Sequence, residues 1–149
     1  MILRGAVITW LKDDLKLIAS PGETEALAFE ANPKDHAYLV PAFTGLGAPY
    51  WDSEAEGILT GMTRTTKRAE IVRAGLDCIA YQITDVVKAI SEESGIGAAY
   101  AAGIAAGIYN REEVFRQMSR TKFSPKMDAS ERNEKYQGWK AAVEQVLTD

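Results

Sequence analysis

The sequence predicts an α/β or α+β domain that is rich in helices and has a thin sheet. Several segments space their apolar residues three and four positions apart, which is the period of an amphipathic helix. Only two short runs have the character of strands, and two isolated strands are few for such a layout. With 149 residues, the chain has the length of one ordinary domain.

The composition excludes several classes of protein. Hydrophobic residues make up 46% and charged residues 26%, the balance of a soluble globular domain. A net charge of −4 argues against a nucleic-acid partner, because such binding needs a basic face. Cys78 and His36 are the single cysteine and histidine, which excludes an internal disulfide and a zinc site built from several such residues. The N-terminal residues lack the layout of a signal peptide, so we expect a cytoplasmic protein.

Two helices are expected before the first strand. Residues 5–18 space their apolar side chains as a helix does, with charged residues on the opposite face. Ser20-Pro21-Gly22-Glu23 predicts a second helix start, with Ser20 as N-cap and the glutamate three residues later. Asn32-Pro33 ends this helix, because the residue before a proline avoids the helical conformation. The apolar positions of the first segment are Val7, Trp10, Leu11, Leu15 and Ile18.

The two strand candidates enclose an irregular loop. Tyr38-Leu39-Val40 predicts a short buried strand, and residues 57–62 predict a second one. Between them, residues 41–52 contain two glycines, two prolines and three aromatic residues. This composition predicts an ordered loop held by apolar anchors.

Residues 70–93 form the best-defined predicted helix. Arg73 and Asp77 lie four positions apart on its polar face, where they can form an ion pair. Ser94-Gly95 is expected to end the helix. The apolar face consists of Val72, Leu76, Ile79, Ile83, Val86 and Ile90.

Three more helices are expected in the remaining sequence. Residues 97–109 carry no charge, and Gly103 and Gly107 give them the small-residue spacing of some membrane helices. Thirteen residues span only about 20 Å as a helix, short of the roughly 30 Å of a bilayer core, so we favour an internal helix. Residues 111–120 and 130–147 complete the set. The last helix has Tyr136, Trp139, Val143 and Val146 on one face.

Two segments have residue types that bind ligands. Residues 44–47, Thr-Gly-Leu-Gly, have the composition of a phosphate-binding turn, but no lysine follows as in a Walker motif, so we favour a plain turn with positive φ. Asp52, Glu54 and Glu56 have the chemistry of a magnesium site or a general base, and we favour a solvated acidic turn.

The remaining candidate residues favour structural roles. His36 is expected in an exposed loop and Cys78 in the core of its helix. Trp51 and Trp139 are expected to be apolar anchors rather than ligand platforms. The residues alone therefore assemble no complete catalytic site.

Three segments match one known family, in the family's order. The first is VPAFTGLGAPYWD at residues 40–52, and the second pairs GILTGMTR at 57–64 with EIVRAGLD at 70–77. The third is ERNEKYQGWK at 131–140. Together they resemble the glycerol kinases of the FGGY carbohydrate kinase family over nearly the whole chain. Gly75 departs from the family, which usually has serine, threonine, alanine or an aliphatic residue there.

The resemblance implies a partial C-terminal domain, residues 1–149, of an actin-like, ribonuclease H-like ATPase, helix-rich and with a reduced sheet. In the family, ATP and Mg²⁺ bind between two domains and glycerol is phosphorylated on a terminal hydroxyl. The first domain with its catalytic base, and the opening strands of the second, are not in this sequence. A few tens of family residues are also missing where Ile96 meets Gly97, which accounts for the thin sheet. No catalytic, substrate-binding or metal-binding residue is therefore carried over.

Two nucleotide-binding residues are implied by the resemblance. Gly5 matches a glycine whose backbone approaches the nucleotide phosphates, which the absent Cβ permits. Thr9 stands where glycerol kinases usually have a glutamine that contacts the nucleotide, and threonine is shorter. Ordinary packing at the start of a helix is the alternative role for both.

The expected function is that of a glycerol kinase, with this chain inactive by itself and glycerol, or another polyol, as the substrate of the full-length family. The alternative is a non-catalytic association module that pairs with itself or with a separate N-terminal kinase half, because a shortened sheet leaves unpaired edges. A gene-prediction artefact at the 96/97 join is a third possibility. No nucleic-acid or membrane partner is expected.

Overall fold

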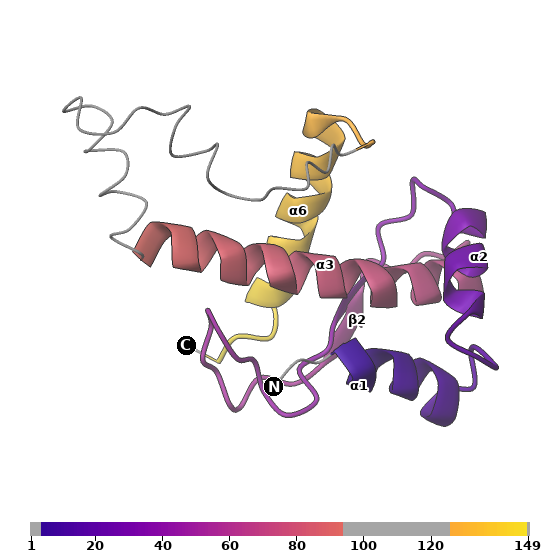
Figure 1. Cartoon of the computed structure of the whole chain (residues 1–149), viewed down its shortest axis with the longest axis horizontal. Helices are drawn as coiled ribbons and strands as arrows, with labels where there is room; N and C mark the ends of the chain where they lie inside the picture. The colour runs from indigo at the N-terminus through magenta and orange to yellow at the C-terminus, as the bar shows by residue number, and fades with distance from the viewer. Residues whose placement is uncertain (1–3, 94–125, 149) are drawn as a thin grey trace, which may run out of the picture.

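One long helix contacts most of the other elements. The structure is a computed structural model, and it describes residues 4–93 and 126–148. Helix α3 (Arg68–Glu93) runs through the middle of the molecule and contacts α1, α2, β1 and α6. In Figure 1, α1 and α2 lie beside the right-hand part of α3 and α6 crosses near its middle, whereas its left-hand end extends past them.

The N-terminal helix changes its winding after six residues. Helix α1 (Arg4–Thr9) continues into a π-helical turn, η1 (Trp10–Asp14), in which the Leu15 N–H donates to the Trp10 carbonyl at 2.9 Å. Lys16 then leaves the helix with a φ of 55°. The sequence prediction of one helix through Ile18 was wrong at its end. Because a π turn holds more residues than an α turn, Leu15 rotates outward and is 41% exposed.

Helix α2 (Glu23–Glu30) begins later than the sequence suggested. Gly22, not Ser20, is the N-cap residue, because the Ser20 carbonyl already closes a turn by accepting the Glu23 N–H at 3.1 Å. The Glu23 carboxylate accepts the Ala19 N–H at 3.3 Å, before the helix, so the predicted capping pair of Ser20 and Glu23 does not form. The helix ends before Asn32-Pro33, as predicted.

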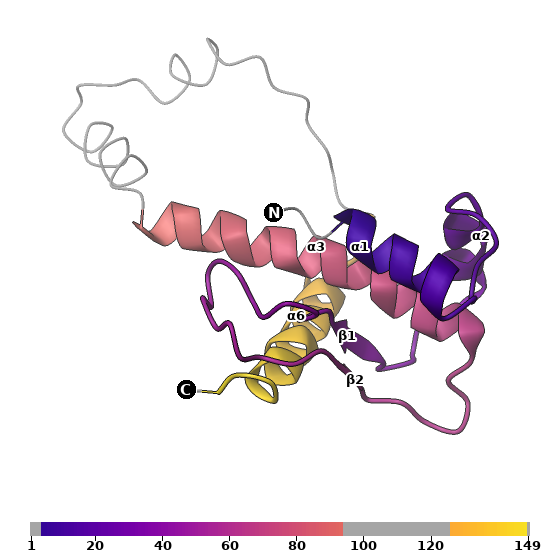
Figure 2. The ribbon, with the colours of Figure 1, turned by 90° about the horizontal axis from the view of Figure 1, so that it is seen from below.

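The two predicted strands pair with each other. Strands β1 (Tyr38–Val40) and β2 (Ile58–Thr60) are antiparallel, with Leu39 opposite Leu59. They make the only sheet in the described part of the chain. Strand β1 contacts both α3 and α6, so the small sheet joins the two helices (Figure 2).

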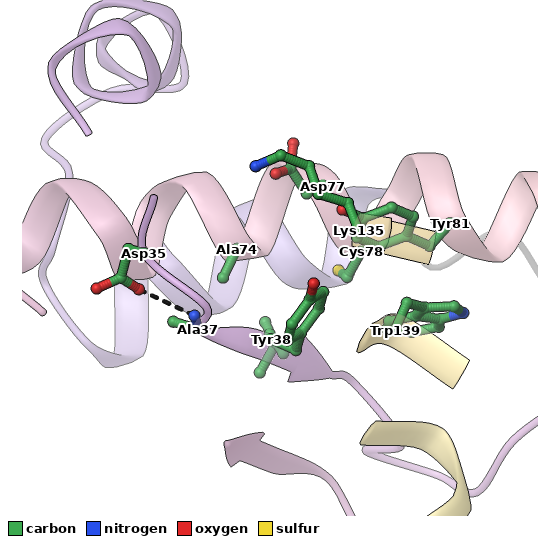
Figure 3. Close-up of a pocket in the computed structure, with 10 residues that line it drawn as sticks. Asp35, Ala37, Tyr38, Ala74, Asp77, Cys78, Tyr81, Lys135 and Trp139 are labelled. Atoms are coloured by element: carbon green, nitrogen blue, oxygen red, sulfur yellow. Dashed lines mark hydrogen bonds between the residues drawn. The ribbon is translucent and has the colours of Figure 1, made fainter. Parts of the chain in front are cut away.

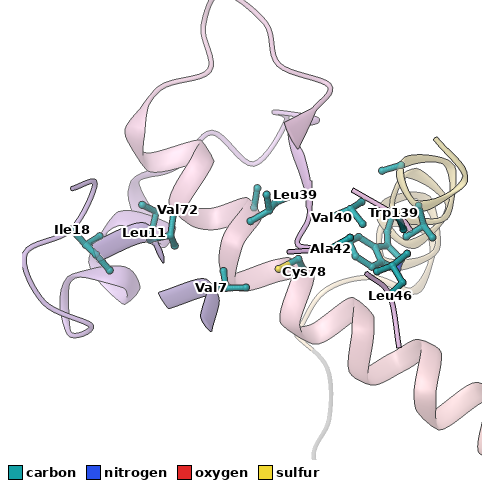
Figure 4. Packing of buried hydrophobic residues seen from close by; sticks show 14 residues of the cluster. Val7, Leu11, Ile18, Leu39, Val40, Ala42, Leu46, Val72, Cys78 and Trp139 are labelled. Carbon is teal, nitrogen blue, oxygen red and sulfur yellow. The ribbon is translucent and has the colours of Figure 1, made fainter. Parts of the chain in front are cut away.

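Close packing of α1 on α3 forms one half of the core. Val7 and Leu11 are fully buried, and Leu11 lies beside Val72 (Figure 4). A Cβ on Gly75 would lie 2.9 Å from Leu11 Cδ1 and 3.5 Å from Val7 Cγ1, so the missing side chain lets the two helices approach. The residue that departs from the family pattern therefore has a packing role in this chain.

The far end of α3 leaves apolar residues uncovered. Ile83 and Ile90, which the sequence predicted on the buried face, are 40% and 60% exposed. Leu76, Ile79 and Val86 are half-buried, and Val72 is buried as predicted. The period of the helix is therefore as expected, but its apolar face extends beyond the elements that cover it.

Helix α6 (Ala129–Glu144) completes the core. Its N-cap is Asp128, whose carboxylate accepts the Ser130 N–H at 2.7 Å. Trp139 and Val143 are fully buried, which confirms the predicted apolar face. The helix ends at Glu144, three residues before the predicted end.

A buried carboxylate on α3 connects three parts of the fold. Asp85 is 3% exposed and accepts hydrogen bonds from Tyr50 Oη at 2.8 Å, from Trp139 Nε1 at 2.7 Å and from Tyr136 Oη. Tyr50 belongs to the loop between the strands, and the other two donors belong to α6. The sequence analysis missed Asp85, although it lies seven positions after Cys78 and therefore on the inward face of α3.

Several sequence predictions lie outside the described residues. These are the helix end at Ser94-Gly95, the join between Ile96 and Gly97, and the helices over 97–109 and 111–120. Among the helices of the described ranges, none has both the length and the apolar character needed to cross a membrane.

The packing of α1 on α3 predicts opposite results for two substitutions of Gly75. Gly75→Leu is expected to destabilise the chain by about 1–3 kcal/mol, because an isobutyl group has to enter space that Leu11 and Val7 fill. Gly75→Ala is the control: its Cβ comes closer than 3.0 Å only to Cδ1 at the far end of Leu11, its contact with Val7 Cγ1 at 3.5 Å is an ordinary one, and the alanine gains about 1 kcal/mol of helix propensity. Urea unfolding measures both, and equal stability of the two variants would contradict this account.

The hydrogen bonds of Asp85 predict that replacing this one carboxylate strongly destabilises the fold. Asp85→Asn is expected to lower the free energy of unfolding by roughly 1–3 kcal/mol, because the amide N–H₂ faces donors and leaves a buried group without an acceptor. Asp77→Asn on the same helix is the matched control. Asp77 forms a half-exposed ion pair with Arg73 at 2.8 Å, so its loss should cost less than about 1 kcal/mol. Similar losses in the two variants would contradict a structural role for Asp85.

Candidate functional site

The two residues expected at a nucleotide site lie on α1. Gly5 is near the start of this helix, and Thr9 is its last residue and is exposed. They are four positions apart, so they lie on the same side of the helix. The packing of Val7 and Leu11 on Gly75 fixes this helix against α3, and Thr9 directly precedes the π turn. The nucleotide-binding role of both residues remains a prediction.

The glycine-containing loop forms a turn that its own backbone fills. Gly45 has a φ of 79°, and a Cβ there would lie 2.7 Å from the Asp52 carbonyl oxygen and from Ser53 Cα. The Leu46 N–H donates to the same Asp52 carbonyl at 2.6 Å. Returning backbone therefore occupies the space beside Gly45, which supports the turn that we favoured over a phosphate cradle.

Asp52 holds the end of the described chain against the loop. Its carboxylate accepts the Thr148 N–H at 2.7 Å, the Thr148 hydroxyl at 2.9 and 3.0 Å, and the Glu54 and Ala55 N–H groups at 3.0 and 3.1 Å. The Thr148 N–H bond is the main reason that the pKa of Asp52 lies below its usual value. The carboxylate is thus used as a hydrogen-bond acceptor within the fold.

The other carboxylates of the acidic turn are not grouped with Asp52. Glu54 and Glu56 are both exposed. Within residues 4–93 and 126–148, no group of three carboxylate, histidine or cysteine side chains is arranged to hold a metal ion. These positions support the solvated acidic turn that we favoured from the sequence.

The other candidate residues divide into buried and exposed ones. His36 is exposed in its loop, and Cys78 is buried in α3, where burial raises the pKa of its thiol to about 12. Trp139 is a core anchor as expected. The prediction for Trp51 was wrong: it is 78% exposed with a φ of 52°. Its neighbour Tyr50 takes the inward position instead, where it reaches Asp85.

One polar cavity inside the described part of the fold is very small. It lies between β1, α3 and α6, and its volume is about 20 Å³, enough for one water molecule (Figure 3). Burial raises the pKa of Tyr38 and of Tyr81, so both phenols stay protonated. Polar side chains at this cavity are those of Asp35, Tyr38, Asp77, Tyr81 and Lys135. The cavity is too small for a nucleotide or a sugar.

A larger depression lies on the surface between α3 and α6. This α3–α6 groove has a volume of about 540 Å³. It is shallow and open, and Thr9 is not among its lining residues. The described residues therefore position a short helix and a rigid loop, and they do not bring together a nucleophile, a base and a metal ligand.

The hydrogen bonds of Asp52 predict a dependence of stability on pH. Because the folded state lowers the pKa of Asp52, the unfolded chain takes up its proton first as the pH falls. The stabilisation that Asp52 provides is complete above the ordinary aspartate pKa. It is lost as the pH falls through the pKa that Asp52 has in the folded state. Between about pH 5 and pH 3, Asp52→Asn should therefore lose stability less steeply than the parent. Unfolding by urea across this range measures the slopes.

A second carboxylate, Glu70, also makes the free energy of unfolding depend on pH. The Asn32 N–H lowers the pKa of Glu70, assisted by the Lys67 N–H. Asp52→Asn should consequently retain part of the acid sensitivity. Identical slopes in the parent and in this variant would contradict the role of Asp52.

Comparison with known proteins places the chain among carbohydrate kinases. Residues 1–118 match the C-terminal domain of the FGGY family of carbohydrate kinases. The glycerol kinase of Caldanaerobacter subterraneus subsp. tengcongensis is 36% identical over 189 residues, which is 99% of this chain and 38% of the relative. The glycerol kinase of Petrotoga mobilis is 38% identical over 188 residues, 98% of this chain and 38% of the relative. The chain thus spans 38% of the length of these relatives.

Solved structures give the same placement. Plasmodium falciparum glycerol kinase with ADP superimposes with a TM-score of 0.72 at 27% identity, covering 98% of this chain and 37% of that protein. Ligand-bound xylulose kinase from Lactobacillus acidophilus has a TM-score of 0.63 at 17% identity over 95% of this chain and 37% of that protein, and shows the fold alone. The expected fold class, a helix-rich part of an actin-like, ribonuclease H-like ATPase domain with a reduced sheet, is confirmed. The chain belongs to the FGGY family of carbohydrate kinases.

Proposed function

We propose that this chain represents part of the C-terminal domain of an ATP-dependent glycerol kinase that acts in the cytoplasm. The observation that carries the proposal is the match to glycerol kinases at 36% and 38% identity over almost the whole chain. In such a kinase, the protein positions ATP, its Mg²⁺ and the acceptor hydroxyl, and a carboxylate receives the hydroxyl proton. This chain would supply one wall of that site and none of its reacting groups.

The described residues fit the nucleotide only in part. Helix α1 offers Gly5, which has no Cβ to obstruct the phosphates, and Thr9, whose side chain is exposed. The described ranges contain no group of side chains arranged for Mg²⁺, and the cavities between α3 and α6 lie away from Thr9. We derive no chemical step from this chain alone, and we expect the other nucleotide and metal ligands to come from residues that it lacks.

In this proposal, the chain also lacks an internal segment that the matched glycerol kinases have. The matched parts of the relatives are 188 and 189 residues long, whereas the whole chain has 149. This difference supports a domain that is shortened where Ile96 meets Gly97. The loss of sheet strands there agrees with a described sheet of only two strands.

A second candidate function is association without catalysis. Within the described ranges, β1 pairs only with β2, so each strand has an edge without a neighbouring strand. Such edges favour pairing with another chain, and a separate N-terminal kinase half is one partner of that kind. In this candidate function, the chain binds a partner and transfers no phosphoryl group.

A chimera distinguishes the two functions. The matched part of Petrotoga mobilis glycerol kinase is replaced by this chain, with the relative's own residues restored between Ile96 and Gly97. Under the kinase proposal, the chimera forms ADP in a glycerol-dependent reaction, whereas this chain alone forms none above a blank without enzyme. A folded chimera without activity would contradict the kinase proposal, and ADP formation by the chain alone would contradict its expected inactivity.

The same chimera tests the role of Thr9. Thr9→Gln restores the longer side chain expected in the family, and one regained hydrogen bond of about 0.5–1.5 kcal/mol should improve kcat/KM for ATP by roughly 2- to 10-fold. The control is Thr65→Gln, an exposed threonine in the connection before α3. Equal effects of the two substitutions would remove Thr9 from the nucleotide site.

A further inference from the structure

The α3–α6 groove combines aromatic walls with positive charge. Tyr81 of α3 and Tyr136 of α6 line it, and the Lys88 ammonium lies 3.8 Å from the centre of the Tyr136 ring. Its four cationic lining residues are Arg73, Lys88, Arg132 and Lys135, against the single carboxylate of Asp77. Arg73 and Asp77 pair with each other, so the groove has a net positive charge in a chain whose net charge is −4.

An exposed segment has the complementary character. The acidic loop, residues 51–56, carries three carboxylates and no cation. Trp51 at its start is 78% exposed and has a left-handed backbone conformation that turns it away from the core. Glu54 and Glu56 are exposed and form no ion pair with any described cation. Asp52 and Tyr50 hold the base of the loop through Thr148 and Asp85, so the loop presents Trp51 in one fixed geometry.

The acidic loop does not occupy the groove of its own chain. The groove is lined by α3 and by the first half of α6, from Ala129 to Tyr136, and by no residue of the loop. The loop contacts the second half of α6, where Tyr50 accepts from Lys140 Nζ at 3.1 Å, and Asp52 binds Thr148 beyond the helix. Tyr50 and Tyr136 donate to the same Asp85 carboxylate, so loop and groove are neighbours, but neither Glu54 nor Glu56 pairs with a groove cation within the chain.

We propose that the acidic loop of one copy of this chain docks into the α3–α6 groove of a second copy. Trp51 lies against the Tyr81 and Tyr136 rings in this complex, whose centres are 6.5 Å apart, and the Glu54 and Glu56 carboxylates meet Lys88 and Arg132. Tryptophan, tyrosine and arginine are the residues that contribute most at protein interfaces. The arrangement needs no phosphoryl transfer and stands apart from the proposed kinase function.

The proposed contact is head-to-tail, so it can join more than two copies. Loop and groove are different surfaces, so a bound pair still has one free loop and one free groove, and assembly continues until a ring closes. The charged pairs are on the surface, so salt weakens them. The association is therefore expected to grow with protein concentration and to decrease with ionic strength.

Sedimentation velocity of the full 149-residue chain tests the proposal. The mean mass should rise with concentration at low salt and fall when salt is added. Trp51→Ala should weaken the association about tenfold, as loss of a central interface residue does. Phe29→Ala is the matched control, because Phe29 of α2 is 82% exposed and belongs to neither surface. It should leave the association unchanged.

Charge reversal gives a test that a folding defect cannot imitate. The double variants Glu54→Lys/Glu56→Lys and Lys88→Glu/Arg132→Glu should each be monomeric when alone. A mixture of the two should associate again, because the reversed loop of the first fits the reversed groove of the second. A monomeric parent at all concentrations, an unchanged mass in both variants, or a mixture that fails to associate would each overturn the proposal.

Discussion

The buried carboxylate of Asp85 determines how the chain closes around α3. A carboxylate that is 3% exposed needs hydrogen-bond donors, and here three aromatic side chains provide them. Two of these donors, Tyr136 and Trp139, orient α6, and Tyr50 orients the loop between the strands. Desolvation together with the Asp85 contact raises the pKa of Tyr50, so this donor keeps its proton. Trp51 and Asp52 follow Tyr50 directly, and Asp52 is held in addition by Thr148.

The second constraint is the distance between α1 and α3. Gly75 removes a side chain from the contact, and Val7 and Leu11 fill the space above it. The helix that carries Gly5 and Thr9 therefore lies close to α3, although its own winding changes at Trp10. A family position usually occupied by a larger residue thus sets the placement of the segment that we assign to the nucleotide.

The exposed surfaces agree with a chain that spans 38% of its relatives. Apolar side chains at the far end of α3, among them Ile83 and Ile90, extend past the elements that cover the rest of the helix. Trp51 is exposed for a different reason, because its backbone turns it outward while Tyr50 is held inside. Exposed apolar surface of this kind favours association with another chain, whether or not the chain has a catalytic role.

The sequence by itself determined the elements that depend on local pattern. The strand at Tyr38–Val40, the long helix α3 and the stop at Asn32-Pro33 follow from side-chain period and from proline sterics, and the structure confirms all three. The family motifs identified the fold class for the same reason, because they are contiguous. Only the tertiary structure decided the partners of Asp85, the outward turn of Trp51 and the role of Gly75. These depend on groups 35 to 68 positions apart in the chain, whose meeting no local period encodes.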